Sequence, residues 1–477
     1  MKHTKIVATV GPASESKDML RALADTGVNV FRLNFSHNEH AWHRDVINRI
    51  REVSAELGMP IGILADLQGP RIRVDGESAE FSVAVGQKVR ISDISRKEFL
   101  PEWGGVTVFL DIAGISDALE VGHAILIEDG TIGLSVTERQ DGAVIAEVKD
   151  DGLIRPRKGV NLPDSKIDLP ILSAKDKQDL KFVIGEGVDF VGLSFVGSAE
   201  DIESARDAMR HFLPEGAPVP DIVAKIERKE AIRNLDTILG ATDVVMVARG
   251  DLGIEMPESE VVILQKDIIR RSLAALKPVI VATQMMKSMT ESPTPTRAEV
   301  SDVTNAVVDH ADAVMLSEET AAGKFPVETI ATMREIIERT EESPFDDLYK
   351  ALGLNMKSEY AALIRGVYEF AKSFETKAIV LLSLSGFTAK LISHFRPERD
   401  IIVATNDRHT WNKLTLLWGV TGYLFEGNEK LDTLDDLAIE EAKKVGLLGS
   451  GDKTVVFLGR VPGERDTHRL VGIREIR

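Results

Sequence analysis

Residues 221–251 of the chain read DIVAKIERKEAIRNLDTILGATDVVMVARGD. The apolar runs at 221–227 and 244–250 are typical of buried strands, and the stretch between them fits a helix. Lys225 and Glu227 alternate at the end of the first run and therefore share one face, while Asp251 follows the second run. Because charged side chains are costly to bury singly, these strand ends require partners or ligands.

The same pattern recurs on both sides of this unit. Six further strand-like runs alternate with helical stretches, at 5–11, 28–36, 61–69, 190–196, 277–284 and 312–319. Eight strand–helix repeats are the number of a (β/α)8 barrel, and we favour that fold. An open, doubly wound sheet is the alternative, because alternation alone does not show that a sheet closes.

Two regions break the alternation. Short strands with Asp-Gly turns at 129–130, 141–142 and 151–152 predict a small β domain inserted at 70–165. The segment 343–358 looks like a boundary, and a separate α/β unit follows it. We therefore expect an α/β protein with a barrel at 1–69 and 166–345, an inserted β domain at 70–165 and a C-terminal α/β domain at 346–477.

Composition excludes several classes of function. The chain has 477 residues, with 58 Lys and Arg against 76 Asp and Glu, and contains no cysteine. The acidic balance argues against non-specific binding to nucleic acid or to an anionic membrane. Without cysteine there can be no disulfide, thiolate metal site or cysteine nucleophile. No apolar run approaches the roughly 20 residues of a membrane helix, and the N-terminus lacks a signal-peptide core, so we expect a cytoplasmic protein.

Unusual polar residues follow almost every strand of the predicted barrel, at the end where barrel enzymes carry their catalytic groups. Glu227 and Asp251, from adjacent strands, suit a hard divalent cation that also bridges substrate phosphates. Lys225 and Arg32 would supply positive charge to a transferring phosphoryl group. The other members of the set are Asn34, Ser36, Asp66, Gly250, Thr283, Ser317 and Glu319.

Taken singly, each of these residues has a structural explanation. Lys225 and Glu227 alone would more often be an ion pair, and Thr283 or Ser317 alone a turn hydroxyl. Their convergence on one end of the barrel reverses that judgement. The residues alone therefore predict a Mg-dependent enzyme that acts on a phosphorylated or carboxylated metabolite.

Ten ordered motifs, spread over essentially the whole chain, resemble those of the pyruvate kinase family. They are KIVATVGPAS, FRLNFSH, DLQGPRIR, EDGTIGLSV, RKGVNLP, VAKIER, VMVARGDLGIEMP, ATQMMKSM, PTRAEVSDVTNAVVD and MLSEETAAGKFP. The resemblance implies a TIM barrel with an inserted small β-barrel lid and a C-terminal regulatory domain, assembled as a homotetramer. It also implies phosphoryl transfer from phosphoenolpyruvate to ADP with Mg2+ or Mn2+, giving pyruvate and ATP.

The resemblance also implies roles for individual residues. Glu227 and Asp251 match the Mg2+ ligands, Lys225 the catalytic lysine and Arg32 the phosphate-binding arginine. The remaining matches are a cradle for the substrate carboxylate, made by Gly250, Asp251 and Thr283, and a proton-relay end, made by Thr283, Ser317 and Glu319. Nucleotide phosphates would be contacted by Asn34, His37, Arg73 and Lys158, of which Lys158 lies on the lid.

The chain departs from the family pattern at the site of a monovalent cation. Many members hold K+ with an Asn, a Ser, an Asp and a following Thr, and here Leu67 replaces that Thr after Asn34, Ser36 and Asp66. Arg71 occupies a position that is Glu in K+-dependent relatives and basic in K+-independent ones. We therefore expect little activation by K+; the alternative is a K+-activated enzyme without an allosteric effector.

Two turns and one loop also differ. The motifs SHNE and SEET place Asn38 and Glu318 where the family usually has glycine, and Asn tolerates a positive φ better than Glu. In the C-terminal domain, SLSGFTAK (383–390) resembles the effector loop, with Ser383, Ser385 and Thr388 before a helix. The loop lacks the basic residues of fructose-1,6-bisphosphate-regulated relatives, so a sugar monophosphate or AMP is the expected effector, and a plain strand-to-helix turn the alternative.

Two other functions are compatible with the barrel. One is a lyase or mutase acting on phosphoenolpyruvate or pyruvate, which would not depend on ADP and is disfavoured by Lys158 and Arg73. The other is a binding or assembly protein with an inactive site, disfavoured by the intact strand-end residues.

Overall fold

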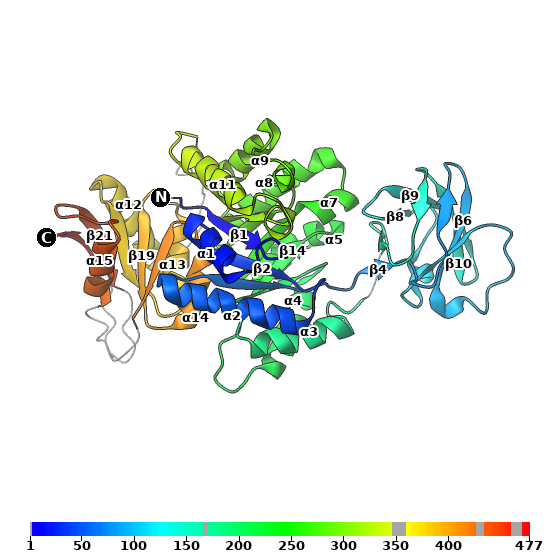
Figure 1. The fold of residues 1–477 in the computed structure, drawn as a ribbon, viewed down its shortest axis with the longest axis horizontal. Coiled ribbons are helices and arrows are strands. Elements are labelled where there is room, and N and C mark those ends of the chain that lie inside the picture. Colours follow the sequence, from blue (N-terminus) through cyan, green and yellow to red (C-terminus); the bar gives the residue numbers. More distant parts are fainter. Residues whose placement is uncertain (1, 166–168, 346–358, 426–433, 459–469) are drawn as a thin grey trace.

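The computed structural model describes residues 2–165, 169–345, 359–425, 434–458 and 470–477. A barrel occupies the centre, with the C-terminal domain at one end and the inserted β domain at the other (Figure 1). Most of the predicted boundary segment at 343–358 lies outside the described residues. No helix in the part of the chain covered by these ranges is both long and apolar enough to span a membrane.

The predicted (β/α)8 barrel is confirmed. Eight parallel strands close in the order β1-β17-β16-β15-β14-β13-β3-β2. Strands such as VVMVA are buried along their whole length because helices cover the outside and packed side chains fill the inside. The strands are β1 (Lys5–Thr9), β2 (Val30–Asn34), β3 (Gly62–Asp66), β13 (Phe190–Leu193), β14 (Asp221–Ile226), β15 (Val244–Ala248), β16 (Val279–Ala282) and β17 (Ala313–Leu316).

Helices connect these strands and form the outer layer. The helix after Pro295 begins with a capping box: the Thr296 hydroxyl accepts the amide of Glu299, and the Glu299 carboxylate accepts the amide of Thr296. On this helix Val303 and Val307 are buried against the barrel, whereas Val300 is 36% exposed. The helices are α1 (Lys17–Thr26), α2 (His40–Leu57), α3 (Ala174–Gly185), α4 (Ala199–Phe212), α5 (Lys229–Arg233), α6 (Leu235–Ala241), α7 (Arg249–Glu255), α8 (Glu258–Ala274), α9 (Arg297–Val308), α10 (Glu318–Ala321) and α11 (Pro326–Glu341).

The inserted domain, called the lid below, is a curled seven-stranded sheet with its own apolar core. A bridge between Val74 and Leu110 joins the two edges of the sheet, so it closes into a small barrel. The turns at 129–130 and 141–142 connect paired strands as predicted; the hairpin predicted at 151–152 is wrong, because β11 pairs with the distant β5. The seven strands of this sheet are β4 (Ile72–Arg73), β6 (Lys88–Asp93), β7 (Thr107–Leu110), β8 (Ala124–Ile127), β9 (Ile132–Gln140), β10 (Ala143–Val148) and β12 (Gly159–Asn161). The other two strands, β5 (Phe81–Val83) and β11 (Gly152–Ile154), form a separate two-stranded sheet.

The C-terminal domain is a five-stranded sheet with an apolar cluster on each face. Its first four strands in sequence are parallel, as the α/β pattern predicts, and the last strand adds antiparallel to one of them. The elements are α12 (Glu359–Ser373), β18 (Ala378–Leu382), α13 (Phe387–His394), β19 (Asp400–Thr405), α14 (Arg408–Lys413), β20 (Val420–Leu424), α15 (Leu434–Lys444), β21 (Lys453–Leu458) and β22 (Leu470–Glu475).

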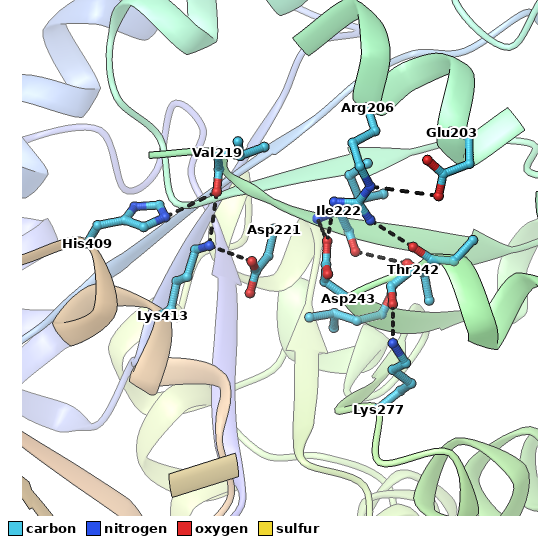
Figure 2. Close-up of polar contacts among 12 residues, drawn as sticks. Glu203, Arg206, Val219, Asp221, Ile222, Thr242, Asp243, Lys277, His409 and Lys413 are labelled. Carbon is cyan, nitrogen blue, oxygen red and sulfur yellow. Dashed lines mark hydrogen bonds and ion pairs between the residues drawn. The ribbon is translucent and has the colours of Figure 1, made fainter. Parts of the chain in front are cut away.

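Acidic residues at the starts of the barrel strands hold the C-terminal domain to the end of the barrel away from the lid. Lys413 Nζ lies 2.5 Å from Asp221 Oδ1, and both Lys413 and His409 contact the carbonyl of Val219 (Figure 2). Nearby, Arg396 Nη1 lies 2.9 Å from Asp312 Oδ1. The C-terminal domain thus covers the end of the barrel where the strands begin. The opposite end, where the strands finish, faces the lid and is not covered by this junction.

Candidate active site

Four charged side chains meet at the lid-facing ends of β2, β3 and β14. Arg32 pairs with Asp66, with Nη2 2.6 Å from Oδ2, and Lys225 Nζ lies 3.2 Å from Asp66 Oδ1 and 2.9 Å from Glu227 Oε1. The carboxylates of Asp66 and Glu227 are each 1% exposed. Strand alternation brings these side chains together, because each points to the same end of a closed barrel.

Burial and charge pull the pKa values of this cluster in opposite directions. Burial lowers the pKa of Lys225, but the carboxylates of Asp66 and Glu227 outweigh it and hold that pKa above its ordinary value. Burial raises the pKa of Asp66, but Lys225 and Arg32 outweigh it and hold that pKa below its ordinary value. Lys225 is therefore a fixed cation, and Asp66 a fixed anion, at neutral pH.

The negative charge of Glu227 is only partly compensated by its neighbours. Burial raises its pKa to about 7, with Lys225 opposing and Asp251 adding to the rise. Its Oε2 accepts the amide of Phe195 at 2.7 Å, whereas its buried Oε1 has no well-aligned hydrogen-bond donor. A buried carboxylate oxygen without a donor fits a cation better than it fits a structural ion pair.

The donor set fits a hard divalent ion. Asp251 lies in the first turn of α7, and its charge acts on both Glu227 and Lys225. Within the described ranges, no group of three or more His, Asp or Glu side chains gathers as a metal site. Two carboxylates are nevertheless enough for Mg2+, which keeps several waters and takes further oxygens from substrate phosphates.

Thr283 and Gly250 meet beside this cluster. The Gly250 amide donates to Thr283 Oγ1 at 2.8 Å. Thr283 and Gln284 both have positive φ, 69° and 54°, which is rare for a β-branched residue and is typical of functional sites where surrounding contacts hold a strained backbone. The structure thus brings together Gly250 and Thr283, two of the three residues of the predicted carboxylate cradle.

Glu319 holds the turn after β17. Its two carboxylate oxygens accept the amides of Ser317, at 2.8 Å, and Met286, at 3.2 Å, and the side chain is 1% exposed. Glu318 begins the short helix α10, so the replacement of glycine there requires no positive φ, and it pairs with Lys287 at the surface. Asn38 does have a positive φ, 63°.

The predicted nucleotide contacts are divided between the barrel and the lid. Asn34 Oδ1 accepts the amide of Ser36 at 3.0 Å, and the carbonyl of His37 lies 3.0 Å from the Nε2 atom of His43, so the 34–37 turn is well tied. On the lid, Lys158 Nζ pairs with Glu128 at 2.7 Å. Arg73, also on the lid, donates to the carbonyl of Arg157. The side chains of Lys158 and Arg73 therefore both contact other residues of the lid rather than residues of the barrel.

The carboxylate of the predicted K+ site already has two cationic partners. Asp66 is paired with Arg32 and Lys225, and Leu67 is buried. Arg71 pairs with Asp129 at 2.7 Å and lines a cavity of about 420 Å³ between lid and barrel.

In the C-terminal domain, Ser383 and Thr388 are buried and Ser385 is exposed, around the turn at Gly386 that begins α13.

Sequence reasoning missed Ser194. Its hydroxyl accepts from Lys225 Nζ at 2.7 Å and donates to the carbonyl of Leu67 at 2.8 Å, so it orients the lysine. Its place directly after β13 was the available signal, since Asp66, Lys225 and Thr283 also lie at or next to the ends of their strands.

Comparisons with known proteins agree with this geometry. The family model for the pyruvate kinase barrel domain matches residues 1–330, and the model for the pyruvate kinase alpha/beta domain matches residues 361–471. Pyruvate kinases from Staphylococcus epidermidis and Geobacillus stearothermophilus are 39% identical over 99% and 100% of this chain, and over 80% of their own length. That of Staphylococcus haemolyticus is 41% identical over 99% of this chain and 80% of its own.

Proposed function

The chain belongs to the pyruvate kinase family and is a phosphotransferase, and we propose that it converts phosphoenolpyruvate and ADP to pyruvate and ATP at the Arg32–Asp66–Lys225–Glu227 cluster. The observation that carries this assignment is the buried Lys225, which stays protonated between two buried carboxylates. Phosphoryl transfer depends chiefly on positioning and on neutralising charge, and a fixed cation of this kind serves both.

The metal we propose is Mg2+, with Mn2+ as a substitute, held by Glu227 and Asp251. When bound it would neutralise charge on the transferring phosphoryl group and on the enolate oxygen. The support for this is the raised pKa of Glu227 and its Oε1 atom without a donor. Arg32 on β2 and Lys225 on β14 would bind the phosphoryl group at the ends of the barrel strands.

The substrate carboxylate would lie against Gly250, Asp251 and Thr283. In this pose the substrate would lie next to the Gly250 amide and the Thr283 hydroxyl, which are already hydrogen-bonded to each other. After the phosphoryl group leaves, the enolate is protonated at carbon from the end of the site near Thr283 and Ser317. Because both oxygens of Glu319 accept backbone amides, we assign it to holding Ser317 in place.

ADP would enter between the 34–37 turn and the lid. Arg73 and Lys158 would contact its phosphates when the lid moves toward the barrel and excludes water. Exchange of the Lys158–Glu128 pair for a phosphate contact is feasible, since these side chains are 40% and 24% exposed.

We further propose that the enzyme does not need K+. The support is the Arg32 and Lys225 contacts to Asp66, which occupy a carboxylate that a monovalent cation would otherwise use, together with Leu67 in place of a hydroxyl ligand. Arg71, directly before the first strand of the lid, supplies a further positive charge. Rates in K+-free and K+-rich buffer at equal ionic strength test this, and a large stimulation by K+ contradicts it.

For the regulatory side, we propose a sugar monophosphate or AMP at Ser383, Ser385 and Thr388, in a cytoplasmic homotetramer. The turn at Gly386, with φ 77°, and the helix that follows it make a suitable phosphate site. A thermal-shift screen of sugar phosphates and AMP that gives no response would remove this effector.

The first experiment is pyruvate formation from phosphoenolpyruvate with Mg2+, with and without ADP, in K+-free buffer. Turnover that depends on ADP is expected. Turnover without ADP would indicate a lyase or mutase, and turnover only after K+ is added would keep the kinase and discard K+ independence.

A further inference from the structure

We infer that Arg249 is a positioning residue for the reaction, acting by clamping Thr283 in its left-handed backbone conformation. This rests on the proposed function, because it assigns Arg249 a role through a residue of the proposed substrate cradle. Arg249 begins α7, directly before Gly250 and Asp251, and its side chain is only 9% exposed.

All five N–H donors of the Arg249 guanidinium have acceptors. Three acceptors lie in the segment that leaves β16: the carbonyl of Ala282 accepts from Nε at 3.3 Å, the carbonyl of Thr283 from Nη2 at 2.6 Å, and the sulfur of Met285 from Nη2. The other two donors reach Asp302 on α9, at 2.7 Å, and Gln265 on α8, at 3.4 Å. Only a guanidinium supplies five donors in this fixed, planar arrangement.

The contacts of Arg249 fall on a segment whose backbone is strained. Thr283 and Gln284 have φ of 69° and 54°, and a β-branched residue such as Thr avoids this region unless its surroundings impose it. Arg249 donates hydrogen bonds to the carbonyls of Ala282 and Thr283, which lie on either side of the Thr283 Cα. The Thr283 hydroxyl oxygen then accepts the Gly250 amide at 2.8 Å.

The same residue fixes the relative position of two parts of the site. Arg249 lies two residues before Asp251 along α7, and its guanidinium holds the end of β16. Asp251, proposed to bind the metal, and Thr283, proposed to face the substrate, are therefore connected through one buried side chain. Released from the clamp, Thr283 would relax toward ordinary backbone angles and its hydroxyl would leave the Gly250 amide.

Kinetics of R249K, T283A and the double variant test the clamp, with kcat/KM for phosphoenolpyruvate measured at saturating ADP and Mg2+. Lysine keeps the charge but loses two donors and the planar shape, so R249K is expected to lose at least tenfold. If Arg249 acts through Thr283, the double variant is no more than twofold slower than T283A alone. Losses that multiply in the double variant would overturn the inference, as would a rate for R249K close to that of the unaltered chain.

Two further variants separate positioning from stability. R334K changes a surface arginine of α11 in the same way and is expected to leave the rate unchanged. D302N retains the three contacts to residues 282–285 and is expected to cost less than threefold; a loss as large as that of R249K would assign the effect to α9 and contradict the clamp. ADP-dependent turnover of the unaltered chain tests the proposed function separately, and a T283A variant with normal rate would remove the basis for the clamp.

Discussion

Glu227 Oε1 lies 2.9 Å from Lys225 Nζ, yet the pKa of Glu227 is raised to about 7. Burial is the larger cause, and the Asp251 carboxylate adds to it, so the ion pair with Lys225 does not compensate for the loss of water. Lys225 is shared with Asp66 as well. With Asp251 included, three carboxylates (Asp66, Glu227 and Asp251) face only the two cations Arg32 and Lys225. The cluster is therefore short of one positive charge, which a divalent cation would supply.

This shortage predicts competition between protons and metal. As pH falls through about 7, a growing fraction of Glu227 carries a proton. Mg2+ binds only the ionised carboxylate, so the proton and the metal compete for Glu227. The concentration of Mg2+ that gives half-maximal rate is expected to rise about tenfold between pH 8 and pH 6, since one pKa unit corresponds to one decade. Initial rates over a Mg2+ series at saturating substrates measure it.

A neighbouring carboxyl provides the control for this experiment. Glu255 also has a pKa raised by burial, with a smaller contribution from the Asp251 charge, but it accepts the amide of Lys229 and makes no ion pair with Lys225. E255Q should retain the pH dependence of the Mg2+ requirement. A constant half-saturating concentration from pH 8 to pH 6 in the unaltered chain would contradict the role given to Glu227.

A second prediction concerns Ser194, which orients Lys225. S194A removes the acceptor that holds Nζ at 2.7 Å, while Asp66 and Glu227 continue to hold the charge in the site. We expect kcat to fall about three- to tenfold, the scale of one hydrogen bond worth about 1 kcal/mol. Steady-state rates with both substrates saturating measure the effect.

Ser393 offers a matched control, because it is equally buried and donates to the carbonyl of Trp418 at 2.7 Å in the C-terminal domain. S393A should lower the thermal midpoint and leave kcat unchanged. If S194A and S393A lower stability equally and neither changes kcat, Ser194 is structural.

Much of the fold could be predicted from the sequence, because the barrel strands are mostly apolar runs and a segment of helical period follows each of them. β22 could not be predicted in this way, since its pairing with β21 joins two segments on opposite sides of residues 459–469 and depends on tertiary contacts. The hairpin expected at Asp151-Gly152 failed for a similar reason: the turn signal is local, but the partner strand β5 lies about 70 residues earlier.

The site was predictable where geometry follows from topology. Strand ends of a barrel converge, so Arg32, Asp66 and Lys225 had to lie near one another. The pairing of Arg32 with Asp66 was not predictable, because it depends on side-chain rotamers. Nor was the positive φ of Thr283, since the residue type itself disfavours that conformation.

The lid supplies a third prediction. Lys158 is paired with Glu128, which also accepts from Arg155 at 3.1 Å, so a nucleotide phosphate must compete with Glu128 for Lys158. K158M is expected to raise KM for ADP about tenfold and to leave KM for phosphoenolpyruvate unchanged, because it removes a charge-assisted contact to the nucleotide phosphate. E128Q is expected to lower KM for ADP two- to threefold, because it weakens the partly exposed ion pair that competes for Lys158. Initial rates over an ADP series measure both.

Lys149, which pairs with Glu147 on the same domain, is the control, and K149M should leave both KM values unchanged. An unchanged KM for ADP in K158M would remove Lys158 from the nucleotide site. A rise in KM for both substrates would indicate that the lid as a whole is disturbed.

Asp221 and Lys225 lie at opposite ends of β14, and the final prediction concerns the end that faces the C-terminal domain. Lys413 Nζ contacts Asp221 at 2.5 Å and the carbonyl of Val219 at 3.0 Å (Figure 2). K413M leaves a partly buried carboxylate without its cation. We expect a loss of about 1 kcal/mol, which corresponds to a thermal midpoint lower by about 2–4 °C for a domain of this size.

D221N should cost a similar amount, and the double variant should be no less stable than either single variant, because the two side chains stabilise the junction as a pair. K443M, which removes an exposed i,i+3 pair on α15, is the control and should change little. We expect kcat to be unchanged in all of these variants, because the partners of Lys225 lie at the other end of the strand and are themselves buried. Single losses that simply add would show that Asp221 and Lys413 act separately, and a kcat lowered more than threefold would show that β14 transmits a displacement from this junction to Lys225.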